Sequence, residues 1–204
     1  MITTLISFVF ATVTLAFSPG PDNIFVLTQG VVNGKKYGFA TVAGLMLGCL
    51  VHTSFVAFGV SEVIKRNSSI FLVIKLIGVF YMLYLAYDIY KSDASITFST
   101  ENIDKKNTIE LFKIGFWMNV LNPKITIFFL AFLPQFLFSD KIPSLIQFYV
   151  LGGIFILTSF IVFSSIVLLA DSLSGLVKKN KKIGEYFKWA QIIVFVIIAI
   201  LILF

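Results

Sequence analysis

Charged residues, cysteine and histidine are all scarce in this sequence. Only 13% of its 204 residues are charged, about half the share found in soluble domains. Cys49 is the single cysteine, which excludes an internal disulfide and a CxxC redox pair. With His52 as the single histidine, one chain cannot assemble a zinc or iron–sulfur site. No GxSxG, HExxH or Walker motif is present, so nothing in the sequence points to an enzyme or a redox carrier.

Apolar residues dominate instead. They make up 58% of the chain, and the mean hydropathy is +0.99. A soluble fold of this length has too little interior to bury so many apolar side chains. The first residues show neither a basic segment nor a small-residue cleavage site, so the first apolar run is expected to remain as a membrane span. We therefore expect an integral membrane protein.

Six apolar runs are long enough to cross a bilayer, which takes about 20 helical residues. The predicted spans lie near residues 2–32, 38–61, 69–90, 111–138, 145–170 and 184–204. A polar segment divides them into two sets of three. We predict an all-α integral membrane fold with a first three-helix repeat over residues 1–95, a polar cytoplasmic connection over 96–110 and a second three-helix repeat over 111–204.

Proline motifs interrupt the first and fourth spans, which are also the longest. The interruptions are Ser18-Pro19-Gly20-Pro21-Asp22 and Asn119-Val120-Leu121-Asn122-Pro123-Lys124. Proline removes a backbone donor and clashes with the preceding turn, so each helix should break there. Corresponding breaks in two halves indicate a transport site near the membrane midplane, although single proline kinks are also common in membrane helices. Because each half has three spans, the two halves would be inverted repeats.

Lysine and arginine are distributed unequally between the connections. Connections one–two, three–four and five–six carry Lys35, Lys36, Lys91, Lys105, Lys106, Lys113, Lys178, Lys179, Lys181, Lys182 and Lys188. The opposite side has only Lys65, Arg66 and Lys141. Since basic connections remain in the cytoplasm, the pattern predicts that both termini lie outside.

Asp22 and Lys124 are the charged residues at the predicted helix breaks. A charge inside the membrane costs at least about 3 kcal/mol, so each needs a partner or a polar cavity. Asp22 could bind a substrate ammonium group, carry a coupling proton, or only cap the half-helix that follows it. Lys124 could bind a substrate carboxylate, pair with Asp22, or extend to the membrane surface. Together they would complement a zwitterionic amino acid.

Uncharged polar residues accompany these charges. Asn23, Asn119 and Asn122 offer donors and acceptors, and their spacing of three places Asn119 and Asn122 on one helical face.

The second span carries Ala40, Gly44, Gly48 and His52 at intervals of four. Small residues in such a stripe allow another helix to approach closely. His52 should therefore face protein. There it either packs against a neighbouring helix or takes part in proton transfer or substrate binding, since histidine titrates near neutral pH.

Several motifs follow one another in a characteristic order. They are Ser18–Asp22, Asn33–Gly38, the stripe Gly44, Gly48 and His52, Lys75–Leu85, Gly115–Lys124 and Phe128–Phe136. Together they resemble the LysE/RhtB family of amino-acid exporters over residues 5–137. The last third departs from the pattern, because the sixth span has no glycine from Trp189 to Phe204.

The resemblance implies a secondary active exporter of amino acids or closely related small metabolites in the cytoplasmic membrane, by antiport with an ion that we expect to be H+. It implies no organic cofactor and neither a metal nor a nucleic acid as partner; a homo-oligomer remains open. The substrate or proton path would involve Pro19, Gly20, Pro21, Asp22, Asn23, His52, Asn119, Asn122, Pro123 and Lys124.

Cation or metal efflux is the alternative within the transporters. It would need a cluster of oxygen ligands, and Asp22, Asp88 and Asp171 are few and far apart in the sequence. A membrane enzyme or a scaffold protein is a further alternative, but neither would need paired broken helices.

Overall fold

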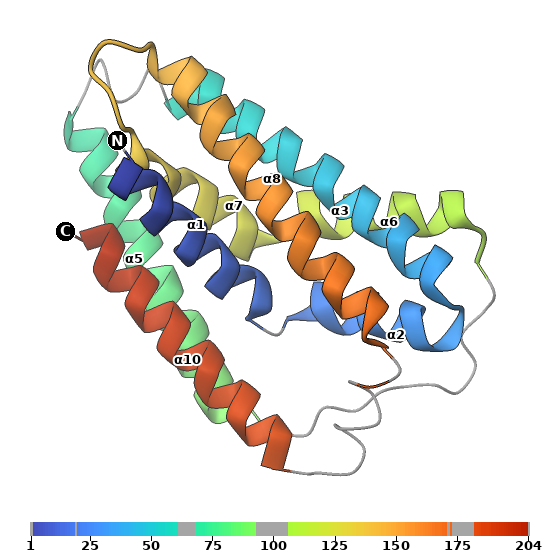
Figure 1. The fold of residues 1–204 in the computed structure, drawn as a ribbon. Coiled ribbons are helices and arrows are strands. Elements are labelled where there is room, and N and C mark those ends of the chain that lie inside the picture. Colours follow the sequence, from blue (N-terminus) through green and yellow to red (C-terminus); the bar gives the residue numbers. More distant parts are fainter. Residues whose placement is uncertain are drawn as a thin grey trace.

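The computed structural model describes residues 2–18, 20–60, 68–92, 106–170, 172 and 182–203, and these residues form helices joined by short connections (Figure 1). The elements are α1 (Ile2–Phe17), α2 (Pro21–Val32), α3 (Lys35–Phe55), the π-helix η1 (Val56–Val60), α5 (Ser68–Lys91), α6 (Thr108–Val120), α7 (Pro123–Ala131), the 3-10 helix η2 (Leu133–Phe136), α8 (Ser144–Leu168) and α10 (Lys182–Leu203).

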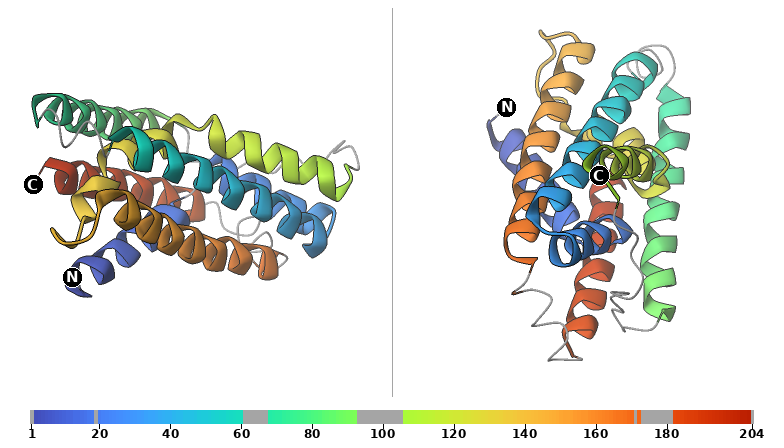
Figure 2. Two further views of the ribbon diagram at one scale, coloured as in Figure 1. Left: turned by 90° about the horizontal axis from the view of Figure 1, so that it is seen from above. Right: turned by 90° about the vertical axis from the view of Figure 1, so that its right-hand side faces the viewer.

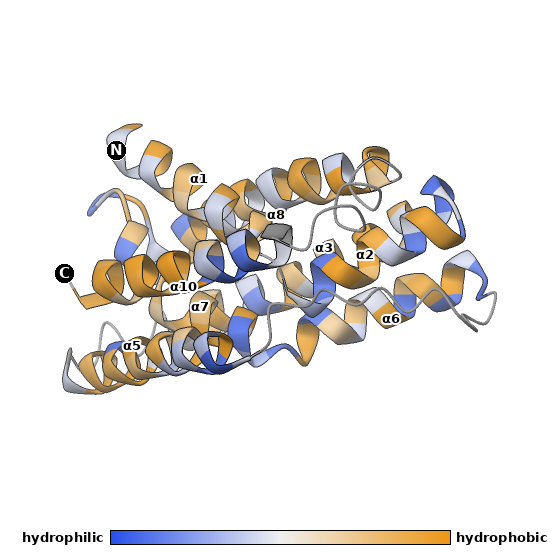
Figure 3. Cartoon of the chain, turned by 90° about the horizontal axis from the view of Figure 1, so that it is seen from below, coloured by the Kyte–Doolittle hydropathy of each residue, from blue (hydrophilic) through white to orange (hydrophobic). Residues whose placement is uncertain are grey.

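The helices are long and apolar enough for a membrane protein. Four can cross a bilayer without interruption, over Lys35–Gly59, Ser69–Lys91, Ser144–Leu168 and Gly184–Leu203. The pairs α1–α2 and α6–α7 bend by 64° and 51°, and if each pair is one span the described residues contain six. Hydrophobic residues dominate along all of these helices (Figure 3). The predicted multi-span helical fold is confirmed at this level, whereas the inverted three-helix repeats stay a prediction.

Both predicted proline interruptions coincide with helix breaks. Pro21 and Pro123 occupy the first turns of α2 and α7. Proline suits this position because the first backbone N–H groups of a helix have no partner within the helix. Pro19 lies outside the described residues. A further proline, Pro134, begins a 3-10 turn after α7, and the π-helix that continues α3 was not foreseen from the sequence.

Glycine allows α3 and α6 to pack with their backbones in contact. A Cβ atom added to Gly44 would overlap the carbonyl oxygen of Phe112, and one on Gly115 would overlap that of Thr41. One on Gly48 would lie 2.7 Å from the Asn119 side chain. The predicted role of the small-residue stripe in close packing is therefore confirmed, and its partner is α6.

The long helices α5 and α10 lie side by side at one flank of the bundle (Figures 1 and 2). They join the rest chiefly where α7 packs on α5, and there a Cβ on Gly78 would overlap Ala131. An aromatic cluster joins α7 to α8. It consists of the buried residues Phe128 and Phe129 of α7, Phe132 at its end and Phe155 of α8, with neighbouring ring centroids 4.6–6.0 Å apart.

Both termini lie at the same end of the bundle (Figure 1). The opposite end holds the α2–α3 connection and the ends of α5 and α8, with the starts of α6 and α10 (Figure 1). Both termini at one end is what an even number of spans requires. Most of the lysines in the sequence belong to the connections at the opposite end. Which end faces the cytoplasm stays a prediction. Residues 96–105 of the predicted polar connection, Lys65, Arg66 and Asp171 lie outside the described residues.

Candidate functional site

The two helix breaks meet inside the bundle and are joined by Asn122. Its side-chain oxygen accepts a hydrogen bond from the backbone nitrogen of Lys124 at 3.0 Å and so caps α7. Its amide nitrogen donates to Oδ2 of Asp22, in the first turn of α2, at 3.1 Å. Asp22 is 8% exposed. One asparagine therefore fixes the start of one half-helix and binds the carboxylate of the other.

Lys124 spans the same gap in the opposite direction. Its Nζ atom lies 3.7 Å from the place that a Cβ would occupy on Gly20, the residue that precedes α2. The ammonium group also lies 4.8 Å from the ring centroid of Phe195 on α10, within the range of a cation–π interaction. Lys124 is thus directed into the bundle, and in this structure it rests on Phe195 without forming a direct ion pair with Asp22.

The electrostatics of the breaks favour an additional anion. Each helix N-terminus carries a partial positive charge of about half a unit from its free N–H groups. Gly20 provides no side-chain cap for α2, and Lys124 adds a full positive charge at the start of α7. Asp22 balances only part of this total. A carboxylate group of a ligand would therefore be stabilised between the two half-helices.

One sequence expectation about the polar residues is wrong, and one of the alternatives for Asp22 loses its support. Asp22 does not cap α2, because its carboxylate accepts from Asn122 and the N-cap position is held by Gly20. Asn119 and Asn122 do not share a helical face, because α6 ends at Val120 and Asn122 is already the cap of α7. Asn23 has a structural contact: its amide donates to the Ala16 carbonyl oxygen near the end of α1 at 2.7 Å.

His52 supports the break between α6 and α7. Its Nε2 atom lies 3.0 Å from the backbone oxygen of Asn119. In a continuous helix this oxygen would accept from residue 123, but Pro123 has no N–H. The Asn122 N–H donates to this oxygen at 3.0 Å, and a proton on Nε2 of His52 adds a second donor from α3. His52 is 4% exposed, so the expectation that it faces protein is confirmed. Its hydrogen bond to the Asn119 oxygen is a structural contact.

A small polar cavity lies at the meeting point of the breaks. Its volume is about 30 Å³, close to that of one water molecule. The residues that line it come from α1, α2, α3, α6, α7 and α8, and they are Leu15, Ala16, Asp22, Asn23, Met46, Cys49, Asn119, Lys124, Ile125, Phe155, Ser159 and Phe163. Asp22, Asn23, Asn119 and Lys124 were predicted for the site, and the structure brings them together around one cavity.

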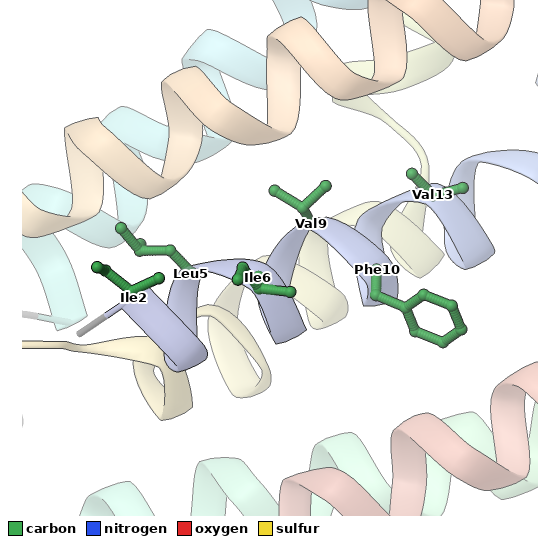
Figure 4. Close-up of a pocket in the computed structure, with 6 residues that line it drawn as sticks. All are labelled: Ile2, Leu5, Ile6, Val9, Phe10 and Val13. Carbon is green, nitrogen blue, oxygen red and sulfur yellow. The ribbon is translucent and has the colours of Figure 1, made fainter.

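Larger hollows lie on the outside of the bundle and are apolar. One of about 450 Å³ is lined by Ile2, Leu5, Ile6, Val9, Phe10 and Val13, all on α1 (Figure 4). None of these side chains can bind a charge, and an apolar groove on a membrane helix suits lipid chains. The interior cavity that is lined by Asp22 and Lys124 is therefore the candidate site.

Three residues around the cavity were not predicted. Cys49 on α3 accepts a weak hydrogen bond from the Asn119 amide at 3.4 Å, Ser159 projects from α8, and Phe195 lies under Lys124. For Ser159 a signal existed, because it lies four residues from both Phe155 and Phe163 and so shares their helical face. Neither of the other two residues belongs to a recognisable motif.

Known proteins share this sequence pattern over most of its length. The chain is 27% identical to the homoserine/homoserine lactone efflux protein of Salmonella typhi over 176 residues, which is 86% of this chain and 84% of that relative. The corresponding protein of Salmonella typhimurium strain LT2 is 26% identical over the same shares. No solved structure matches. The family model described as LysE type translocator matches residues 13–204, so the chain belongs to this family of membrane transporters.

Proposed function

We propose that this protein is a secondary active exporter of small zwitterionic amino acids, with its transport site in the cavity between the two helix breaks. The observation that carries the proposal is the placement of Asp22 and Lys124 around one interior cavity without a direct ion pair. Two opposite charges that are left apart match the ammonium and carboxylate groups of one amino acid. Efflux of homoserine and its lactone by the named relatives supports the same cargo class.

Each charged group of the cargo has a partner in this proposal. Its ammonium group binds the Asp22 carboxylate, which in the described structure has the Asn122 amide as its hydrogen-bond donor. Its carboxylate binds Lys124 and the free N–H groups at the starts of α2 and α7. Lys124 then leaves the Phe195 ring. The described cavity is too small for an amino acid, so the half-helices must move apart to admit one.

Coupling to protons is assigned to Asp22. A buried carboxylate is costly when it is charged and unpaired. Asp22 therefore binds either the cargo ammonium group or a proton, but not both, and this exclusion is the requirement of an antiport. The predicted location is the cytoplasmic membrane, with the lysine-rich end of the bundle inside the cell and both termini outside.

Efflux from proteoliposomes loaded with homoserine tests the site. We expect Asp22→Asn and Lys124→Gln each to lower the proton-driven rate at least tenfold, because each removes one charge that binds the zwitterion. Asp88→Asn and Lys113→Gln make the same changes on exposed positions of α5 and α6 and should export normally. Normal export by both site variants would refute the site, and absence of amino-acid export by the intact, inserted protein would refute the function.

Cation or metal efflux has less support. Within the part of the chain that the structure describes, no three His, Cys, Asp or Glu residues come close enough to hold a metal ion. A loaded-vesicle assay with divalent cations would distinguish the two cargo classes.

A further inference from the structure

Two buried polar atoms beside the cavity have no protein partner. They are Oγ of Ser159, a residue that is 2% exposed, and Oδ1 of Asn119, a residue that is 4% exposed. More than nine in ten buried polar groups in proteins are hydrogen-bonded, so each exception needs an explanation. Both residues line the cavity that also holds Asp22 and Lys124.

Ser159 differs from most hydroxyl groups on the described helices, although Ser18 and Ser164 also lack a partner. Other hydroxyl groups on its helices donate to the carbonyl oxygen four residues earlier, at 2.7–3.2 Å: Thr12, Thr14, Thr41, Thr53, Ser54 and Ser165. Ser159 could make the same bond to Phe155 but does not. Its hydroxyl group therefore remains available on the cavity wall formed by α8.

Asn119 is held rigidly in its place. Its backbone oxygen is bound by His52, and its side chain fits against Gly48, where an added Cβ would lie only 2.7 Å from Cβ and Oδ1 of Asn119. The amide nitrogen has the Cys49 sulfur as its partner at 3.4 Å. The remaining oxygen is thus a preorganised acceptor on the wall formed by α6.

We propose that Ser159 and Asn119 form a subsite that binds a hydroxyl group on the side chain of the cargo, and that Ser159 is a specificity-determining residue. A hydroxyl group donates and accepts at once, so it can satisfy the amide oxygen and the serine hydroxyl together. Phe155 and Phe163 lie one helical turn to either side of Ser159, and both line the same cavity. The inference rests on the proposed function, in which Asp22 and Lys124 bind the main-chain charges.

Homoserine and 2-aminobutyrate test the subsite, because they differ only by the terminal hydroxyl group. Both would be loaded together at equal concentration into proteoliposomes, and the ratio of their initial efflux rates would be measured. For the unaltered protein we expect a ratio of at least about ten, since a site built to bind a hydroxyl group rejects the analogue that lacks it. For Ser159→Ala we expect the ratio to fall to below about three.

Ser164→Ala is the matched control. Ser164 lies on the same helix and its hydroxyl group also has no partner among the described residues, but it does not line the cavity. Its substitution should leave the ratio unchanged. Asn119→Leu, which keeps the side-chain size and the backbone acceptor for His52, should lower the ratio as Ser159→Ala does. It provides a second measurement if Ser159→Ala fails to insert.

The outcomes separate the two proposals. Equal export of both compounds by the unaltered protein, or an unchanged ratio in Ser159→Ala and Asn119→Leu, would overturn the hydroxyl subsite and leave the exporter intact. Export of neither compound by correctly inserted protein would overturn the proposed function and this inference with it.

Discussion

Of the glycine-to-alanine substitutions on the described helices, Gly44→Ala should weaken the contact between α3 and α6 the most. The added Cβ would overlap the Phe112 carbonyl oxygen and lie 2.8 Å from the backbone nitrogen of Phe116. Real Cβ atoms essentially never come within 3.0 Å of such neighbours. Because the obstacle is backbone, no side chain can turn aside and the two helices must separate.

Gly153→Ala provides the reference for the size of this effect. Gly153 also lies within a helix, but nothing is within 4 Å of its added Cβ. Both variants gain the same helix propensity from alanine, so their difference reports the clash alone. Overpacking costs about 1–3 kcal/mol, and a rigid backbone neighbour places Gly44→Ala at about 2–3 kcal/mol. This corresponds to roughly a 30- to 160-fold change in the ratio of unfolded to folded protein.

Reversible unfolding in mixed detergent, followed by the fluorescence of Trp117 and Trp189, would measure the difference. We expect Gly44→Ala to unfold at clearly lower denaturant than Gly153→Ala. Gly48→Ala should fall between them, because its Cβ would meet the Asn119 side chain at 2.7 Å and would not overlap backbone atoms, but the strain that it places on Asn119 should lower efflux. Equal midpoints for Gly44→Ala and Gly153→Ala would refute the close approach of α3 and α6.

Three other predictions concern single contacts. His52→Ala should lower the free energy of unfolding by about 0.5–1.5 kcal/mol, because it removes one of two donors to the Asn119 carbonyl and leaves the Asn122 N–H in place, while the pH profile of efflux keeps its shape; a changed profile would instead support proton transfer by His52. Cys49 should react slowly with maleimide in the closed protein and faster while transport opens the cavity. Saturating cargo that occupies the cavity should make the reaction slow again; labelling at a constant rate would contradict an opening cavity. Asn107→Ala removes a capping box with Glu110 and should cost about 1 kcal/mol without altering efflux, as denaturation and transport assays would show.

Local chemistry made the helix breaks predictable. The steric effect of Pro21 and Pro123 acts on the adjacent turn, so it can be read without knowing the fold. The glycine stripe was readable for the same reason, since the spacing of four depends on a single helix. Partners were not readable: Asn122 binds Asp22 across 100 residues of sequence.

Hydrogen-bond saturation was also beyond the reach of the sequence. A serine within an apolar helix normally bonds its own backbone, as Ser165 does. The spacing of Ser159 from Phe155 and Phe163 indicates its helical face but not that its hydroxyl group leaves the Phe155 carbonyl oxygen unbonded. The helix end at Val120 lies within the predicted interruption Asn119–Lys124. The wrong step was to place Asn119 and Asn122 on one helical face, because the residues just before a proline already leave the helix.

The pairing of α5 with α10 has a consequence for biosynthesis. About 90 residues of chain separate Lys91, which ends α5, from Lys182, which begins α10. At 5–20 residues per second, a ribosome needs roughly 5–18 s to synthesise that stretch. During this interval α5 is surrounded by lipid on the surface that α10 will later cover. Synthesis of α10 therefore completes this helix pair long after α5 has been made, and a chain that is cut short before α10 would leave α5 without its partner for membrane quality control to recognise.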